Sequence, residues 1–299
     1  MSSDKPVADY VRRGRRAAEQ AGRRAVAPLV AVRRQRDELA RTSAKLSQTR
    51  ARLKASQEEV EHLKDQLRAA RADRDARRAS GAVETVLQRV RAENLTFLTV
   101  PALRDLALAA QDLEANHMTG VVVEAGTARG GSAIVLAAAK AADRPMKVYD
   151  VFGLIPEPGE RDGEEGRDRY RVIEAGEAKG PGGETYHGYR ENLYDEVTES
   201  FARLGVEPAE RAVELVKGRF EDTIRVDEPV ALAHLDADWY ASTMTSLERL
   251  APLLVSGGRL VVDDYASSPG CRAAVEEYFR DRHMDFRFEQ HQRLHVVRR

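Results

Sequence analysis

The stretch VVVEAGTARGGSA, residues 121–133, joins a run of β-branched residues to a glycine-rich turn. A helical pattern follows over residues 132–141, and a second apolar run, MKVYDVF, occupies 146–152. A strand, a helix and another strand in succession are typical of parallel strands, because the intervening helix lets the chain return in the same direction. We therefore expect a parallel sheet that is covered by helices on both faces.

The same alternation continues on both sides of this stretch. Strands are predicted at residues 120–126, 146–152, 212–218, 230–238, 258–265, 286–290 and 293–299. Further helices are predicted at residues 83–92, 101–115, 193–204, 242–254 and 271–282. The last two strands have no helix between them, so they should form a hairpin that adds an antiparallel strand. Seven strands with this ending predict an α/β, Rossmann-like class I methyltransferase fold.

Charge is distributed unevenly along the 299 residues, although the totals of 48 basic and 49 acidic residues nearly cancel. Residues 1–80 contain 21 Lys and Arg against 11 Asp and Glu, whereas residues 81–299 contain 27 against 38. This division predicts a basic N-terminal arm over 1–80 and a separate α/β domain over 81–299.

The single cysteine, Cys271, excludes an intrachain disulfide framework and a zinc site built from cysteines. No apolar run approaches the roughly 18 residues that span a bilayer, and the N-terminus lacks the apolar region of a secretory signal. We therefore expect a cytoplasmic protein whose contact with any membrane is peripheral.

The arm contains a heptad repeat in a stretch without Gly or Pro. Its apolar residues recur every seven positions, at Val32, Leu39, Leu46, Leu53, Val60 and Leu67. This spacing predicts a coiled coil over about 32–74, and with it a homo-oligomer. The alternative is a single solvated helix that is held by charged i,i+4 pairs.

The basic residues 1–36 favour either contact with an anionic surface or a disordered tail. They lack the interleaved aromatic and basic residues that stack on bases, so we expect no nucleic-acid partner.

The glycine-rich turn is a candidate ligand site, because ligands of such sheets bind at the carboxyl ends of the strands. Its glycines permit close approach of a ligand, and the helix that follows offers free N–H groups. The spacing E-x-G-x-x-x-G differs from the dinucleotide pattern G-x-G-x-x-G, which favours S-adenosylmethionine (SAM) over NAD. The candidate cofactor residues are Glu124, Gly126, Thr127, Gly130, Gly131 and Ser132, with Asp150 at the end of the second strand for the ribose hydroxyls.

Four carboxylates follow the fourth and fifth predicted strands, Asp236 and Asp238 in HLDADWY and Asp263 and Asp264 in VVDDY. Adjacent parallel strands end at one edge of the sheet, so these groups would repel one another unless they share a cation or a proton. An all-oxygen donor set favours Mg²⁺. The alternative is a set of helix N-caps or loop carboxylates. We interpret His234, inside the same strand, as a core residue and not as a ligand.

Several blocks in this order resemble the macrocin O-methyltransferase family, whose members methylate sugar hydroxyls on antibiotics with SAM and magnesium. The resemblance spans about residues 95–299 and rests on VVVEAGTARGGSA, YDVFGLIPEP, FARLGV with VELVKGRFEDTI, LDADWYASTMTSLERLAPLLVSGGRLVVDDY, and PGCRAAVEEYF. It implies that Asp236, Asp263 and Asp264 bind Mg²⁺ and that Asp236 is also the general base. It further implies that the glycine-rich turn and Asp150 bind SAM. The heptad arm lies outside the family pattern.

Together these features predict a SAM- and Mg²⁺-dependent O-methyltransferase that acts on a hydroxyl of a sugar, a glycosylated natural product or a polysaccharide. Residues 156–189 contain eight of the 21 glycines, and we expect them to form a lid loop that includes His187 as a candidate substrate contact. One alternative is a catechol-type O-methyltransferase of a small diol. Another is a non-catalytic, methyltransferase-like scaffold that works through its coiled coil, although the intact turn and acidic residues disfavour it.

Overall fold

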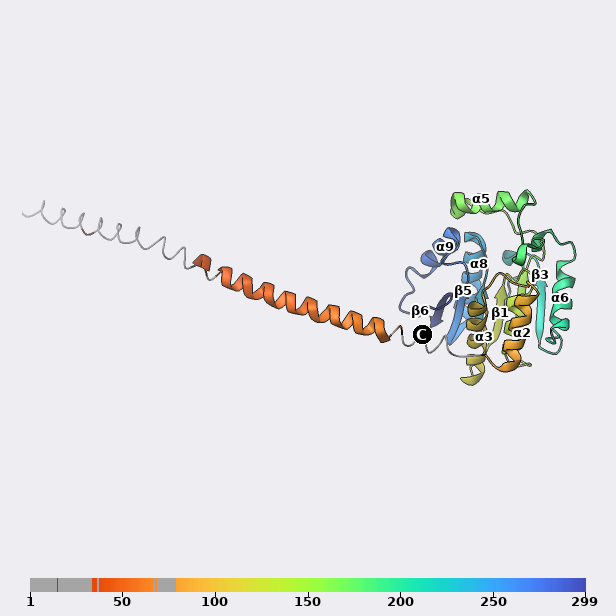
Figure 1. The fold of residues 1–299 in the computed structure, drawn as a ribbon, viewed down its shortest axis with the longest axis horizontal. Coiled ribbons are helices and arrows are strands. Elements are labelled where there is room, and N and C mark those ends of the chain that lie inside the picture. Colours follow the sequence, from red (N-terminus) through yellow and green to blue (C-terminus); the bar gives the residue numbers. More distant parts are fainter. Residues whose placement is uncertain (1–14, 16–33, 37, 67, 69–78) are drawn as a thin grey trace, which may run out of the picture. The chain divides into compact units, whose positions relative to one another are not determined.

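The computed structural model of the chain describes residues 15, 34–36, 38–66, 68 and 79–299 (Figure 1). The chain divides into two compact units, Met1–Asp73 and Arg74–Arg299. Within the described ranges, no helix combines the length and the apolar character that crossing a membrane requires.

The described part of the N-terminal unit is helical over residues 34–36 and 38–66. Four heptad residues project from it with exposed side chains, namely Leu39, Leu46, Leu53 and Val60. Charged pairs such as Lys64 and Glu61, 2.7 Å apart, lie along the same helix. Val32, Leu67 and the end of the predicted coiled coil at 69–74 lie outside the described residues. The helix is therefore compatible with both the coiled coil and the solvated-helix alternative.

Seven strands form one sheet in the order β3-β2-β1-β4-β5-β7-β6 (Figure 1). They are β1 (Val121–Ala125), β2 (Met146–Asp150), β3 (Val213–Lys217), β4 (Val230–Leu235), β5 (Leu254–Val262), β6 (Phe286–Gln290) and β7 (Leu294–Arg298). Strands β1 to β5 pair in parallel, whereas β7 runs antiparallel to both β5 and β6. The strand order reverses between β1 and β4, which places a crevice at their carboxyl ends. This topology confirms the predicted fold class.

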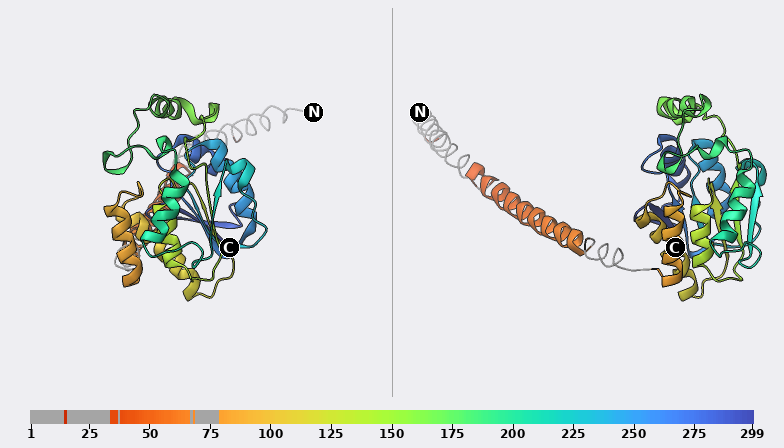
Figure 2. Two further views of the ribbon diagram at one scale, coloured as in Figure 1. Left: turned by 90° about the vertical axis from the view of Figure 1, so that its right-hand side faces the viewer. Right: turned by 45° about the vertical axis from the view of Figure 1, so that its right-hand side comes forward.

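Helices cover both faces of the sheet (Figure 2). One face is covered by α2 (Gly81–Ala92), α3 (Val100–Ala115), α4 (Gly131–Ala139) and α6 (Leu193–Arg203), and the other by α7 (Phe220–Thr223), α8 (Tyr240–Leu250) and α9 (Pro269–Phe279). Leu103 of α3 and Phe201 of α6 belong to the first core, whereas Leu247 and Phe279 belong to the second. Burial of these apolar faces holds the strand ends in fixed register.

The segment 156–189 differs from the irregular loop that its glycines suggested. It contains a helix, α5 (Gly163–Glu174), and three short turns, η1 (Glu160–Asp162), η2 (Pro181–Gly183) and η3 (His187–Tyr189). The glycines of α5 lie only in its first four positions, and the residues after Gly166 are good helix formers. Arg171 and Glu164, 2.7 Å apart, add an ion pair along the helix.

Strand β4 ends at Leu235 and not at 238, but the start of β5 differs most from the sequence prediction. Strand β5 begins at Leu254, four residues before the predicted start, and α8 ends at Leu250. Pro252 has no N–H with which to continue the helix, so the chain passes through a short turn, η4 (Ala251–Leu253), directly into the strand.

Candidate active site

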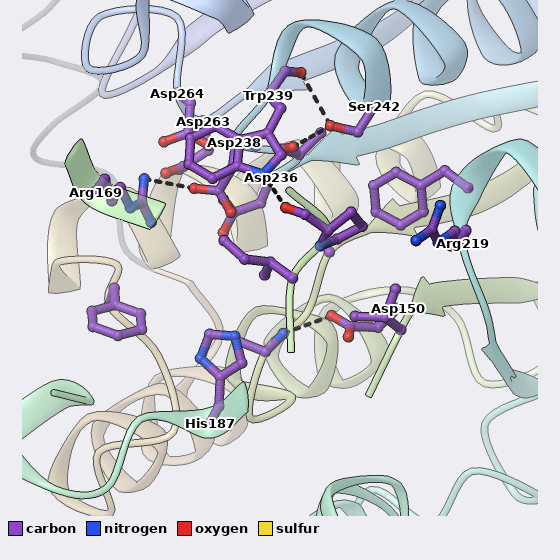
Figure 3. Close-up of a pocket in the computed structure, with 18 of the residues that line it drawn as sticks. Asp150, Arg169, His187, Arg219, Asp236, Asp238, Trp239, Ser242, Asp263 and Asp264 are labelled. Atoms are coloured by element: carbon purple, nitrogen blue, oxygen red, sulfur yellow. Dashed lines mark hydrogen bonds and ion pairs between the residues drawn. The ribbon is translucent and has the colours of Figure 1, made fainter. Parts of the chain in front are cut away.

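A pocket opens at the carboxyl ends of β1, β2, β4 and β5 (Figure 3). It encloses about 910 Å³ when its open mouth is included. Five of the predicted site residues line it: Gly126, Asp150, Asp236, Asp263 and Asp264. The crevice between β1 and β4 therefore brings the glycine-rich turn and the acidic residues to one cavity.

Gly126 brings the glycine-rich turn into backbone contact with the end of β4. Its φ is 89°, and a Cβ built on it would lie 1.9 Å from the carbonyl oxygen of Asp236. A larger residue would force the two strand ends apart, so glycine is required here for close approach. Gly130, with φ 87°, ends the turn at the N-terminus of α4.

Asp150 at the end of β2 holds the glycine-rich turn in place. Its Oδ2 accepts hydrogen bonds from the backbone N–H groups of Thr127 (2.8 Å) and Ala128 (3.0 Å), and its Oδ1 accepts one from Phe152 (2.7 Å). Burial raises the pKa of Asp150, and these backbone donors oppose that rise. A carboxylate can accept about four hydrogen bonds, so Asp150 can accept one more, for example from a ligand hydroxyl. Asp150 therefore supports the turn as well as facing the pocket.

His234 links the glycine-rich turn to the acidic residues. The side chain is fully buried on β4, with Nδ1 2.8 Å from Oε1 of Glu124 and Nε2 3.8 Å from Oδ1 of Asp263. Burial lowers the pKa of His234, but its proximity to the Asp263 carboxylate, its hydrogen bond with Glu124 and the charges of both outweigh burial and raise the pKa to about 9. At neutral pH the ring is thus a cation between two carboxylates. The interpretation as a core residue was correct but missed this connection.

Asp236, Asp263 and Asp264 form a cluster in which each residue places a carboxylate oxygen within 4.8 Å of the others. Burial, followed by the charges of Asp263 and Asp264, raises the pKa of Asp236 well above its ordinary value. Burial acts on Asp263 in the same way, but the nearby His234 ring and the hydrogen bond and charge of Arg293 hold its pKa below the ordinary value. Oxygen donors at this spacing fit Mg²⁺, whose charge would relieve the repulsion around Asp236.

The segment that contains α5 is attached to the β4–α8 connection beside these acids. Arg169 of α5 lies 2.7 Å from Oδ1 of Asp238, and the indole Nε1 of Trp239 donates to the carbonyl oxygen of Pro156 at 2.9 Å (Figure 3). Burial and the charge of Asp264 raise the pKa of Asp238, which the Arg169 guanidinium opposes. Two polar contacts therefore hold α5 over the acidic end of the pocket.

His187 lies in the pocket wall, and its ring is 6.3 Å from that of Phe97 between centroids. The imidazole is buried, and Nδ1 has no hydrogen-bond partner within the described part of the chain. Burial, followed by the positive charge of Arg169 and other nearby arginines, lowers the pKa of His187 to about 4. The ring is neutral at neutral pH, and Nδ1 is a buried nitrogen without a partner in the described residues.

The remaining predicted cofactor residues belong to the turn but not to the described lining of the pocket: Glu124, Thr127, Gly130, Gly131 and Ser132. Sequence reasoning missed several lining side chains, among them Arg169, Arg219, Phe220, Trp239 and Ser242. Trp239 had a usable signal, because the only tryptophan of the chain directly follows the acidic DAD motif. Arg169 had no such signal, since α5 also contains Arg167 and Arg171 and the sequence does not show which of the three arginines faces the pocket.

A family model described as macrocin O-methyltransferase (TylF) matches residues 32–290. The chain belongs to the macrocin O-methyltransferase family. This confirms the resemblance that the sequence blocks indicated. The match begins at residue 32, well before residue 95, and thus includes the heptad helix. The expectation that the arm lies outside the family pattern was therefore wrong.

Individual relatives agree with this assignment. Demethyldecarbamoylnovobiocin O-methyltransferase of Streptomyces niveus is 31% identical over 192 residues, which cover 61% of this chain and 67% of the relative. The 8-demethyl-8-(2,3-dimethoxy-alpha-L-rhamnosyl)-tetracenomycin-C 4'-O-methyltransferase of Streptomyces olivaceus is 31% identical over 189 residues, with coverage of 61% and 67%. The solved structure of the O-methyltransferase NovP matches with a TM-score of 0.57 and 26% identity, covering 71% of this chain and 87% of NovP. This member of the family is accordingly a SAM-dependent O-methyltransferase, as predicted.

Proposed function

We propose that the protein transfers the methyl group of SAM to a hydroxyl of a sugar or glycosylated natural product, with Mg²⁺ held by Asp236, Asp263 and Asp264. The main support is that the three clustered carboxylates and the glycine-rich turn open onto one pocket. A donor and an acceptor bound there would be held side by side, which is the largest contribution that such a site makes to group transfer.

The acidic residues divide the chemical work between them. A sugar hydroxyl has a high pKa, so its attack on a methyl group requires removal of a proton. When bound, Mg²⁺ would supply a charge that lowers this pKa, and SAM would supply the methyl group. Asp263 is kept ionised by Arg293 and His234. Asp236, whose pKa is raised, is better suited to accept the proton.

The segment over the pocket supports the proposal because it would shield a bound acceptor from water. Trp239, Pro156 and Arg169 line the cavity where the α5 segment contacts the β4–α8 connection. Exclusion of water strengthens the electrostatic interactions within the site and prevents hydrolysis. We therefore assign the α5 segment as the lid, with a helix where the sequence suggested a loop.

The sugar acceptor is supported by the relatives. The Streptomyces olivaceus enzyme is named for a rhamnosyl substrate that it methylates at a 4' oxygen. A catechol-type diol remains the alternative acceptor, because a pocket with clustered carboxylates and Mg²⁺ would also hold two adjacent phenolic oxygens.

Product analysis separates the two acceptors. The purified protein, Mg²⁺ and methyl-tritiated SAM are incubated with glycosylated natural products, sugar nucleotides and catechols, and the labelled products are located by chromatography and mass spectrometry. We expect label on a sugar hydroxyl and its loss in EDTA. Label on catechols alone would reject the sugar acceptor, and full turnover in EDTA would reject the metal.

We also propose that two or more chains associate through the heptad residues of the arm. The supporting observation is the stripe of Leu39, Leu46, Leu53 and Val60, of which even the least exposed, Val60, is 46% exposed. Apolar residues at heptad spacing on a helix bury their surface when a second helix packs against them. A second copy of the chain offers the same stripe in the same register.

A further inference from the structure

A second group of metal-ligating side chains lies away from the acidic residues of the pocket. Asp105 is on α3, His291 lies between β6 and β7, and His295 is on β7. These three residues each offer a ligand atom, and the three atoms lie within 4.8 Å of one another. Helix α3 and the C-terminal hairpin, which are distant in sequence, thus bring two imidazoles and one carboxylate together.

The two imidazoles face opposite oxygens of the same carboxylate. Nδ1 of His291 lies 3.5 Å from Oδ1 of Asp105, and Nε2 of His295 lies 3.2 Å from Oδ2. Both nitrogens are buried, and neither has a hydrogen-bond partner of acceptable geometry in the described ranges. The His295 side chain is only 1% exposed. Buried ring nitrogens normally have a partner, and a metal ion between them and Asp105 would provide one.

Neighbouring residues contact His291 and Asp105 in the way that is typical of metal ligands. Nε2 of His291 lies 3.3 Å from Oε2 of Glu289, on the side of the ring away from Asp105. Metal-ligating histidines usually donate their other ring N–H to such a carboxylate. Gln292 N donates to Oδ2 of Asp105 at 3.2 Å, which orients the carboxylate.

His295 has a different neighbour on its outer side. Nη1 of Arg259 lies 3.5 Å from Nδ1, so the guanidinium is outside the space between the three ligands. The ring therefore presents Nε2, and not Nδ1, to Asp105 and to the space between the ligands.

We propose that Asp105, His291 and His295 bind a divalent transition-metal ion of the Zn²⁺ type. Two imidazoles and one carboxylate suit Zn²⁺ and Co²⁺, whereas Mg²⁺ prefers oxygen ligands throughout. The chain thus has two sites that select different ions by ligand chemistry.

The position of the site indicates a structural role. It joins the β6–β7 connection to α3, and the same connection contains Arg293, whose Nε donates to Asp263 at 2.5 Å. Holding His291 in the connection and His295 at the start of β7 would also hold Arg293, which lies between them, in position beside Asp263.

Metal binding to the full-length protein without a histidine tag tests the proposal. The metal-free protein is titrated with Co²⁺ in excess Mg²⁺ and followed by visible absorption, and Zn²⁺ is titrated by calorimetry. We expect one ion per chain with imidazole-type Co²⁺ absorption. His291→Ala should weaken binding at least tenfold. Two controls should retain it: His283→Ala, which alters an exposed histidine, and Asp264→Asn, which alters the acidic cluster.

A second measurement guards against misfolding of a variant. The thermal unfolding midpoint of the wild type should rise on addition of Zn²⁺, whereas that of folded His291→Ala should not. His291 suits this test because its side chain is 15% exposed, against 1% for His295. Absence of Co²⁺ absorption in the wild type, equal binding in His291→Ala, or loss of binding in Asp264→Asn would each overturn the proposal.

Discussion

Arg293 donates a 2.5 Å hydrogen bond from Nε to Oδ1 of Asp263, so the C-terminal hairpin supplies a counter-charge to a carboxylate that follows β5. His234 approaches the same oxygen from β4 at 3.8 Å. Asp236 has no such counter-charge among its main influences, which are burial and three neighbouring aspartates. The clustered acids therefore differ in their readiness to accept a proton.

This difference predicts distinct effects of the three Asp→Asn substitutions. Asp263→Asn and Asp264→Asn should weaken Mg²⁺ binding and reduce turnover while the domain stays folded, and EDTA should have the same effect on the wild type. Asp236→Asn should reduce turnover most, by about 100-fold or more, because it removes the proposed base as well as a ligand. Calorimetry with Mg²⁺ and steady-state kinetics measure the two effects. Near-normal turnover of Asp236→Asn would refute the base assignment.

Asp150→Ala should weaken SAM binding by roughly tenfold or more, since bonds to a carboxylate are each worth about 1.5 to 3 kcal/mol. The variant loses the proposed ribose contact and also releases the backbone of Thr127 and Ala128. SAM titration by calorimetry gives the dissociation constant. Asp143→Ala, at an exposed turn, is the matched control. An unchanged constant in Asp150→Ala would place the ribose contact elsewhere.

Arg169→Ala should raise the KM of the acceptor several-fold and leave SAM affinity nearly unchanged, because Arg169 attaches α5 at Asp238 and not at the glycine-rich turn. Arg167→Ala on the same helix removes a guanidinium that pairs with Glu164, and it should behave as the wild type. Kinetics with varied acceptor and calorimetry with SAM separate the two affinities. Equal KM values for both variants would argue against a lid function.

The low pKa of His187 predicts a pH-dependent stability. Its folded pKa is about 4 against an ordinary 6.5, so the unfolded chain binds the proton more readily between these values. Stability should fall as the pH drops from about 6.5 to 4, by up to about 3 kcal/mol from this residue. Urea unfolding across this range measures the slope. His187→Asn should make the free energy of unfolding less dependent on pH in this range, whereas His117→Asn, at an exposed position, should not. The same pH dependence in both variants would contradict the low pKa of His187.

Truncation of the arm should abolish self-association but retain SAM binding. Ala79 is buried in the core of the α/β unit, so the truncated chain should begin no later than this residue. Leu46→Asp combined with Leu53→Asp should have the same effect in the full chain, because two charges disrupt the apolar stripe. Light scattering gives the masses at low and high salt. If the full-length and truncated proteins contain the same number of chains per particle, the coiled coil is excluded.

Local patterns were sufficient to predict the sheet. The run at 121–126 has β-branched residues and a terminal glycine, and the absence of a helix between 290 and 293 identified the antiparallel hairpin. The clustering of Asp236, Asp263 and Asp264 could also be predicted, because the carboxyl ends of parallel strands meet at one edge of the sheet. α5 was missed since glycines at its start obscured a helical pattern that begins after Gly166.

The contacts between distant elements could not be predicted in this way. His234 with Glu124, Arg169 with Asp238, and Asp105 with His295 are separated by 69 to 190 residues and depend on side-chain packing across the finished fold. Histidine in a buried strand gives no sequence signal of its partners. Such relationships follow from the three-dimensional arrangement alone.

The contact between Gly126 and the carbonyl of Asp236 has a consequence for how the enzyme can change. The spacing between the donor half and the acceptor half of the site is set by two backbones in van der Waals contact, and no side chain adjusts it. The lid, in contrast, is attached by side chains of α5 and Trp239. Under the proposed function, substitutions in the α5 segment would alter which hydroxyl enters the pocket while the reach of the methyl transfer stays constant.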